Sequence, residues 1–217
     1  MDPQLVARGW NVSRPRVARL MRAMDIASCI RRKWVTTTLS AHSLPVAPNL
    51  LDRQFFPDQL GEVWLSDITY LPSRQGWLYL TTLMDLGDRQ IIGWSLSNSM
   101  DAEQTSICAL NHALIRRPGG CTLFHSDRGV QYACREFRDR LASRKITQSM
   151  SRKGNCWDNA PAESFFKTLK SELKRPDPFE NYQQARTAIF PFIEIWYNRK
   201  RRHSVLNYLT PAQAEHH

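Results

Sequence analysis

The sequence has no apolar run close to the roughly 20 residues that a membrane-spanning helix needs. Its first residues lack both the basic start and the apolar stretch of a signal peptide. It has only five cysteines, an odd number without a C-x-x-C pair, which argues against a zinc ribbon or a disulfide framework. It also lacks internal repeats and low-complexity tracts. These absences predict a cytoplasmic protein with no membrane partner.

Positive charge is abundant. The 217 residues include 30 Lys and Arg and 20 Asp and Glu, which gives a net charge of +10. The excess is concentrated in the first 50 residues, which carry eight basic and two acidic side chains. A basic balance of this size is typical of proteins that bind nucleic acid, because the DNA backbone is a dense row of negative charges.

The distribution of charge, prolines and apolar residues along the chain predicts three parts. These are a partial DNA-binding segment at residues 1–35, a linker interrupted by prolines at residues 36–60, and the core at residues 61–217. In the first part, apolar residues recur at i, i+3, i+4 and i+7 from Val17, which predicts a helix over 13–26. A solvated basic helix is the alternative to a DNA-binding one. The expected phosphate contacts in and after this helix are Arg16, Arg19, Arg22, Arg31, Arg32 and Lys33.

The core predicts an α/β fold. Strand patterns at 63–71, 77–84 and 90–96 are separated by turn residues, which indicates an antiparallel meander. Helical patterns then alternate with short strands; the helices are expected near 102–116, 134–143, 159–174 and 181–199, and the strands near 121–125 and 146–150. This order predicts a mixed sheet with helices on its faces.

Three carboxylates occupy positions where an acidic side chain is not needed to form the predicted strand or helix. Asp67 lies inside a strand pattern, Asp127 ends a buried strand, and Glu163 lies in the first turn of a helix. Each also fits a structural role, as a strand-edge residue, a turn former and a first-turn acid. Together they suit phosphodiester chemistry, in which divalent ions held by carboxylates stabilise the attacking and leaving oxygens.

Basic residues accompany these acids. Lys167, Lys170 and Lys174 continue the helical stripe that begins at Glu163. A solvated Glu–Lys pair is the alternative to a DNA-contacting edge. Further expected DNA contacts lie in the polar loop after residue 150 and in the basic tail: Arg152, Lys153, Arg199, Lys200, Arg201 and Arg202.

Several motifs point to a family. Between Asp67 and Asp127 lie 59 residues, and between Asp127 and Glu163 lie 35. The motifs occupy residues 64–70, 125–132, 154–160, 163–170 and 197–211. With them, the chain resembles the second-reading-frame transposases of bacterial insertion sequences, which carry a retroviral-integrase-like core.

The resemblance implies a ribonuclease-H-like core in which Asp67, Asp127 and Glu163 are both the catalytic residues and the ligands of two Mg²⁺ or Mn²⁺ ions. It implies cleavage at the ends of the element followed by strand transfer. The implied partners are double-stranded DNA (element ends and target), the first-reading-frame product, and a second copy in a homodimer or larger assembly. The implied location is the bacterial nucleoid.

The resemblance also leaves alternatives. Residues 13–33 match the end of a helix-turn-helix-like region, and residues 1–10 are short for the family, which suggests a truncated or internally started copy. The chemistry is shared with a ribonuclease-H-type nuclease that does not transfer strands. A non-catalytic DNA-binding regulator derived from a transposase is a third reading. A zinc site at His125 and Asp127 lacks further ligands at suitable spacing.

Overall fold

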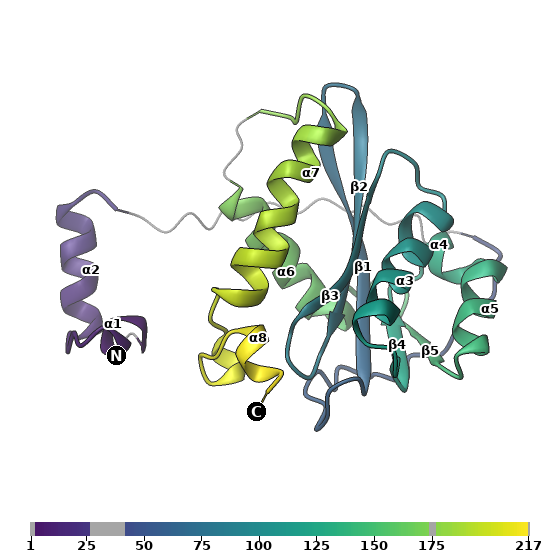
Figure 1. The fold of residues 1–217 in the computed structure, drawn as a ribbon, viewed down its shortest axis with the longest axis horizontal. Helices are drawn as coiled ribbons and strands as arrows, with labels where there is room; N and C mark the ends of the chain where they lie inside the picture. Colours follow the sequence, from purple (N-terminus) through teal and green to yellow (C-terminus); the bar gives the residue numbers. More distant parts are fainter. Residues whose placement is uncertain (1–2, 27–41, 174–176, 217) are drawn as a thin grey trace. The chain divides into compact units, whose positions relative to one another are not determined.

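The computed structural model describes residues 3–26, 42–173 and 177–216 (Figure 1). It divides into two compact units, Met1–Trp34 and Val35–His217. Four of the expected DNA contacts lie outside the described residues: Arg31, Arg32, Lys33 and Lys174. In the part of the chain that is described, no helix is long and apolar enough to cross a membrane.

The described residues of the first unit form two helices, α1 (Pro3–Ala7) and α2 (Arg14–Ala23). The helix expected over 13–26 is therefore confirmed in α2, with Ser13 at the N-cap position and a proline in the first turn. It ends before Asp25, whose φ of 51° is left-handed and cannot continue a helix. The three arginines expected to contact DNA from this helix are exposed on it: Arg16, Arg19 and Arg22.

The second unit is built on a five-stranded sheet of order β3-β2-β1-β4-β5. Its strands are β1 (Val63–Ser73), β2 (Gly76–Asp85), β3 (Ile91–Ser97), β4 (Leu123–Ser126) and β5 (Thr147–Met150). The first three pair antiparallel, as the predicted meander requires. β4 and β5 are parallel to β1. The mixed sheet predicted from the order of strands and helices is therefore confirmed.

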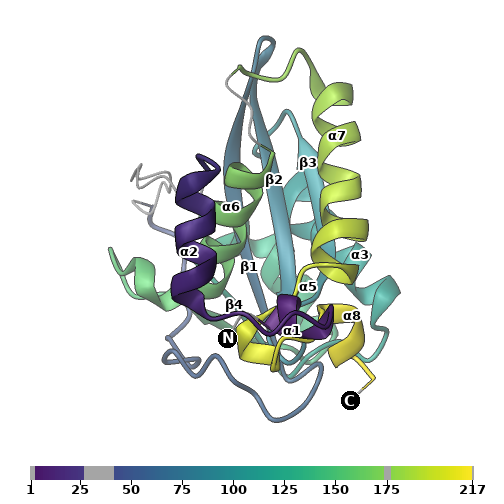
Figure 2. The same cartoon turned by 90° about the vertical axis from the view of Figure 1, so that its left-hand side faces the viewer.

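Helices cover both faces of this sheet (Figures 1 and 2). One face carries η1 (Glu103–Ile107), α3 (Cys108–Arg116), α4 (Val130–Ala133) and α5 (Arg135–Ser143). The other carries α6 (Ala160–Glu172), α7 (Tyr182–Pro191) and η3 (Phe192–Tyr197). The remaining short elements are η2 (Cys156–Asn159), η4 (Ser204–Leu206) and α8 (Pro211–Ala214). Both η1 and η3 are π-helical, so two of the predicted helices change pitch along their length.

Two hydrophobic clusters fill the spaces between sheet and helices. Along β1, Trp64 belongs to the cluster under α3 and α5, whereas Leu65 belongs to the cluster under α6 and α7. Successive side chains of a strand point to opposite faces, so one strand supplies both cores. Helix α3 approaches especially closely at Gly93, where an added Cβ would lie 2.2 Å from the carbonyl oxygen of Ala109.

Residues 42–60, from the segment expected to be a linker, form neither helix nor strand. They nevertheless run against the second unit. Leu51 is buried in the cluster under α6 and α7. The amides of Leu50 and Leu51 donate to the hydroxyl of Ser149 at 2.9 and 3.2 Å.

Candidate active site

The parallel pairing of β1 with β4 sets the positions of the two aspartates. Leu65 lies opposite His125 in this ladder. Continuing the same register places Asp67 opposite Asp127, the residue that follows β4 directly. Neighbouring strands are about 4.8 Å apart. Because side chains alternate, Asp67 points to the same face as Leu65, which is the face covered by α6.

The turn after β4 orients Asp127. The amide of Gly129 donates to Oδ1 of Asp127 at 2.9 Å. Between them, the Arg128 side chain donates to the carbonyl oxygen of Ser151 at 2.7 Å, which ties the turn to the chain leaving β5. The carboxylate is therefore held at the carboxyl end of a parallel strand, where open α/β sheets place their binding sites.

The start of α6 is fixed to β1 beside Asp67. The side-chain amide of Asn159 donates to the carbonyl oxygen of Ser66 at 3.3 Å. Helix α6 begins one residue later, and Glu163 is the acidic residue of its first turn. This hydrogen bond therefore brings the first turn of α6, with Glu163, close to the level of Asp67.

The charges of Asp127 and Glu163 both affect the pKa of Asp67. Burial, and then the negative charge of Asp127, raise the pKa of Asp67 well above its usual value. A hydrogen bond of 2.8 Å from the amide of Ile68 opposes the rise, and the charge of Glu163 adds to it. Burial also raises the pKa of Glu163. The three acids therefore form one electrostatically coupled group.

A lysine of α6 belongs to the same group. The positive charge of Lys170 lowers the pKa of Asp67, against the effect of the carboxylates. Burial lowers the pKa of Lys170, and the charge of Asp67 opposes that shift. The side chains of Lys167 and Lys170 both reach the surface. Sequence spacing predicted this lysine stripe for Lys167 and Lys170, but not the coupling of Lys170 to Asp67.

The residues suit a divalent metal, although the side chains stand apart in their present conformations. Within the described ranges, no three Asp, Glu, His or Cys side chains converge closely enough to hold one cation. The donors are carboxylate oxygens, which Mg²⁺ and Mn²⁺ prefer. Burial and then the charge of Asp127 raise the pKa of Asp67, and a bound cation would offset both effects.

A fourth acid, Asp158, lies just before α6 and is fully buried. Arg152 donates to it through its backbone amide and two side-chain nitrogens, at 2.8 to 2.9 Å. Arg53 and Asn49 add bonds of 2.8 and 3.0 Å. The hydrogen bonds from Arg152 hold the pKa of Asp158 below its usual range. This cluster joins the segment before β1 to the turn that leads into α6.

His125 is not arranged as a metal ligand. Its Nδ1 lies 2.8 Å from the hydroxyl of Ser149, and its Nε2 lies 3.2 Å from that of Ser151. Burial lowers the pKa of His125 to about 4, so the ring is neutral at physiological pH. Both ring nitrogens are engaged inside the core, which leaves none to bind zinc together with Asp127.

The other predicted DNA contacts differ in their surroundings. Arg152 is engaged with Asp158 and also forms an ion pair of 3.2 Å with Asp52. Arg201 is partly buried beside His203. Six have exposed side chains, namely Lys153, Lys167, Lys170, Arg199, Lys200 and Arg202.

Comparisons with known proteins identify the family of the chain. Two family models, both described as Integrase core domain, match residues 57–156 and 144–211. The Insertion element IS600 uncharacterized 31 kDa protein of Shigella sonnei is 40% identical over 212 residues, 98% of this chain and 78% of that protein. Transposase InsF for insertion sequence IS3fB of Escherichia coli (strain K12) is 39% identical over 216 residues, 99% and 75% respectively. The chain belongs to the insertion-sequence transposases with an integrase core.

Solved structures place the fold of this transposase among the retroviral integrase cores. A chain of the simian T-cell lymphotropic virus intasome in complex with PP2A regulatory subunit B56 gamma has a TM-score of 0.61 and 19% identity, covering 81% of this chain and 60% of that one. The HTLV-2 integrase catalytic core domain in complex with magnesium (trimeric form) has a TM-score of 0.55 and 16% identity, covering 72% and 97%. The predicted ribonuclease-H-like fold is confirmed.

Proposed function

We propose that Asp67, Asp127 and Glu163 are the catalytic carboxylates with which this transposase cuts the ends of its element and joins them to target DNA. The observation that carries the proposal is the coupling of all three acids at one end of the β1–β4 ladder. Two aspartates on adjacent parallel strands and a glutamate on the helix above them can surround a single phosphodiester.

The same three residues would hold two Mg²⁺ or Mn²⁺ ions. When bound, such ions supply charge neutralisation at the attacking and leaving oxygens. Asp67 and Asp127 present their oxygens from the rigid sheet, and Glu163 presents its own from the first turn of α6. Lys170, which couples to Asp67, would bind a neighbouring phosphate and help to orient the strand.

The proposed partner is double-stranded DNA, both element ends and target, in the bacterial nucleoid. We assign DNA binding to residues 1–35, the connection to residues 36–60, and catalysis to residues 61–217. The arginines of α2 and the exposed lysines of α6 would contact phosphates, which fix register without reading sequence. We also propose that the chain acts as a homodimer or larger assembly, with the first-reading-frame product as a further partner.

A strand-transfer assay tests the proposal. Labelled DNA carrying the terminal inverted repeats that flank the gene is incubated with the full chain and Mg²⁺, and cut and joined products are separated by size. We expect both products with the unaltered chain. Asp67→Asn, Asp127→Asn and Glu163→Gln should each lower both rates by more than about 100-fold, since each removes a proposed metal ligand. DNA binding without metal should persist.

Asp139→Asn is the matched control because Asp139 is an exposed carboxylate on α5. Its rates should equal those of the unaltered chain. Cut ends without joined product would favour a nuclease. Cutting and joining that survive all three substitutions would remove the proposed triad. An element that is regulated identically with and without them would favour the non-catalytic regulator.

A further inference from the structure

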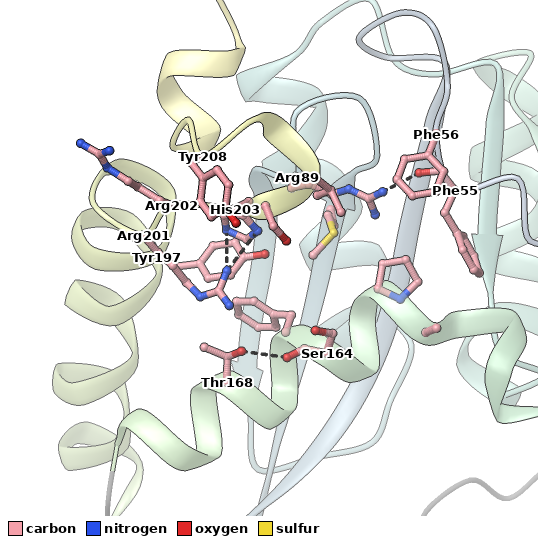
Figure 3. A pocket seen from close by; sticks show the side chains of 16 residues that line it. Phe55, Phe56, Arg89, Ser164, Thr168, Tyr197, Arg201, Arg202, His203 and Tyr208 are labelled. Carbon is pink, nitrogen blue, oxygen red and sulfur yellow. Dashed lines mark hydrogen bonds between the residues drawn. The ribbon is translucent and has the colours of Figure 1, made fainter. Parts of the chain in front are cut away.

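A cavity of about 480 Å³ lies on the side of the sheet that α6 covers (Figure 3). Helix α6 forms part of its wall through Pro161, Ser164 and Thr168. Ser164 follows Glu163 directly, so the cavity and the glutamate occupy adjoining faces of one helix. Its volume lies within the usual range of small-ligand pockets.

The cavity contains positive charge without a matching acid. Arg89, Arg201 and Arg202 line it, and no aspartate or glutamate is among the described residues of its wall. Arg89 and Arg201 lie within the cluster, whereas Arg202 extends outward at its edge (Figure 3). A concave surface with several guanidinium groups and no carboxylate is suited to an anion.

Arg89 is the most informative of the three. Its side chain is buried, with a relative exposure of 6%. One nitrogen donates to the carbonyl oxygen of Phe55 at 2.6 Å. No ion pair joins it to any acid in the described part of the chain. A buried guanidinium is costly unless it is paired. An anionic ligand at this position would supply the missing counter-charge.

Arg201 reinforces the positive field. Its Nη1 lies 3.1 Å from Nδ1 and 3.0 Å from Nε2 of His203. Its guanidinium also lies over the Tyr197 ring, 5.7 Å from the centroid. Burial and the charges of Arg201 and Arg89 lower the pKa of His203 to about 3, so the ring stays neutral and adds no charge of its own. The two arginines therefore set the charge of this part of the cavity.

Aromatic rings complete the wall. The Phe56 ring packs on the Arg89 guanidinium, 5.3 Å from centroid to carbon, and is otherwise 72% exposed. Tyr208 is 39% exposed and lies on the other side of Arg89 in Figure 3. Exposed aromatic rings beside arginines are the usual platform for unstacked bases, because every base offers a flat π face.

We propose that this cavity binds one unpaired nucleotide of the DNA strand, with its phosphate at Arg89 and Arg201 and its base against Phe56. A duplex is too wide to enter a space of this size, whereas a frayed or displaced nucleotide carries both the charge and the planar ring that the walls require. The inference rests on the proposed function only in taking DNA as the partner.

Fluorescence anisotropy of the full chain in EDTA tests this inference, because binding is then measured without catalysis. The probes are a labelled blunt duplex and the same duplex with a few unpaired thymidines at its 3′ end, or at its 5′ end. We expect the unaltered chain to prefer one overhang over the blunt probe. Phe56→Ala and Arg201→Gln should weaken binding of that overhang about ten-fold while changing blunt-duplex binding less than two-fold.

Trp77→Ala and Arg135→Gln are matched controls, since Trp77 is an exposed aromatic residue and Arg135 an exposed arginine, both outside the cavity wall. They should keep the overhang preference. As a second measurement, 5-iodouracil in the overhang should form photo-cross-links at Phe56 or Tyr208. Each variant's thermal unfolding is recorded, and Phe56→Ala, at an exposed position, should leave it nearly unchanged.

An unaltered chain without overhang preference would overturn the inference, as would equal losses on blunt and overhang probes or cross-links only outside the cavity. None of these outcomes affects the carboxylates, whose test is Mg²⁺-dependent cutting and joining. Conversely, failure of the triad substitutions to reduce activity would leave the metal-free binding result standing. The two proposals therefore fail separately.

Discussion

Replacing Asp67 with asparagine is expected to stabilise the metal-free transposase. Asp67 on β1 and Asp127, directly after β4, lie level on the ladder, where neighbouring strands are about 5 Å apart. At that separation, two ionised carboxylates repel by about 3 kcal/mol at an effective dielectric constant of about 20. Both side chains are partly exposed, and screening by solvent reduces this to about 1.5 kcal/mol. Asparagine removes the charge and keeps the oxygen that accepts the amide hydrogen of Ile68.

The effect depends on pH with a definite sign. The pKa of Asp67 is raised in the folded state, so the folded protein holds this proton more tightly than the unfolded chain does. The associated stability is present below the unfolded pKa of about 4 and is lost as pH rises through the folded pKa. Asp67→Asn should therefore resemble the unaltered chain near pH 4 and exceed it at pH 8.

Thermal unfolding in EDTA and in Mg²⁺, followed by circular dichroism, measures the effect. At pH 8 in EDTA, Asp67→Asn should unfold about 3–6 °C higher. Mg²⁺ at ten times its dissociation constant should stabilise the unaltered chain by about 1.4 kcal/mol and the variant by less. Asp139→Asn, at an exposed position, should change neither value. A lower unfolding temperature for Asp67→Asn in EDTA at pH 8, or equal stabilisation of both chains by Mg²⁺, would refute the reasoning.

Three further predictions concern stability. Gly93→Ala should cost about 1–3 kcal/mol by denaturant unfolding, because its Cβ would lie 2.2 Å from the Ala109 carbonyl oxygen; an unchanged midpoint would show that α3 shifts freely. Asp158→Asn should cost about 2 kcal/mol, since it removes the charge that its arginine partners share; equal stability would mean that hydrogen bonds alone suffice. His125 and His203, with pKa values of about 4 and about 3, stay neutral when folded, so stability should fall as pH drops below about 6.5, by about 2.7 kcal/mol per pH unit. A flat profile between pH 6 and 4.5 in urea titrations would contradict this neutral state.

The sheet was largely predictable because local patterns specify it. Alternating apolar residues and turn residues between 63 and 97 predicted three strands, which the structure confirms as β1, β2 and β3. The helices were predictable for the same reason, but their pitch was not. Helix α7 ends at Pro191, where the ring removes a backbone donor and crowds the preceding turn, and the π-helical η3 follows.

The juxtaposition at the site required long-range information. No local sequence pattern predicts that β4 pairs in parallel with β1. Only that pairing places Asp127 opposite Asp67. The same limit hid the role of Asn159, whose partner Ser66 lies 93 residues away. The pocket around Arg89 could not be predicted either. An arginine in a turn is normally expected to be exposed to solvent, and the segments that enclose Arg89 are distant in the sequence.

The parallel ladder between β1 and β4 also governs which changes in chain length the molecule tolerates. The loops at either end of the 98–122 connection, outside η1 and α3, lie away from the ladder, so insertions in these loops leave both aspartates facing each other. A single inserted residue within β1, ahead of Asp67, would instead turn that carboxylate toward the opposite core. The distance along the chain between the two acids can therefore change in these loops, whereas the number of residues in β1 cannot.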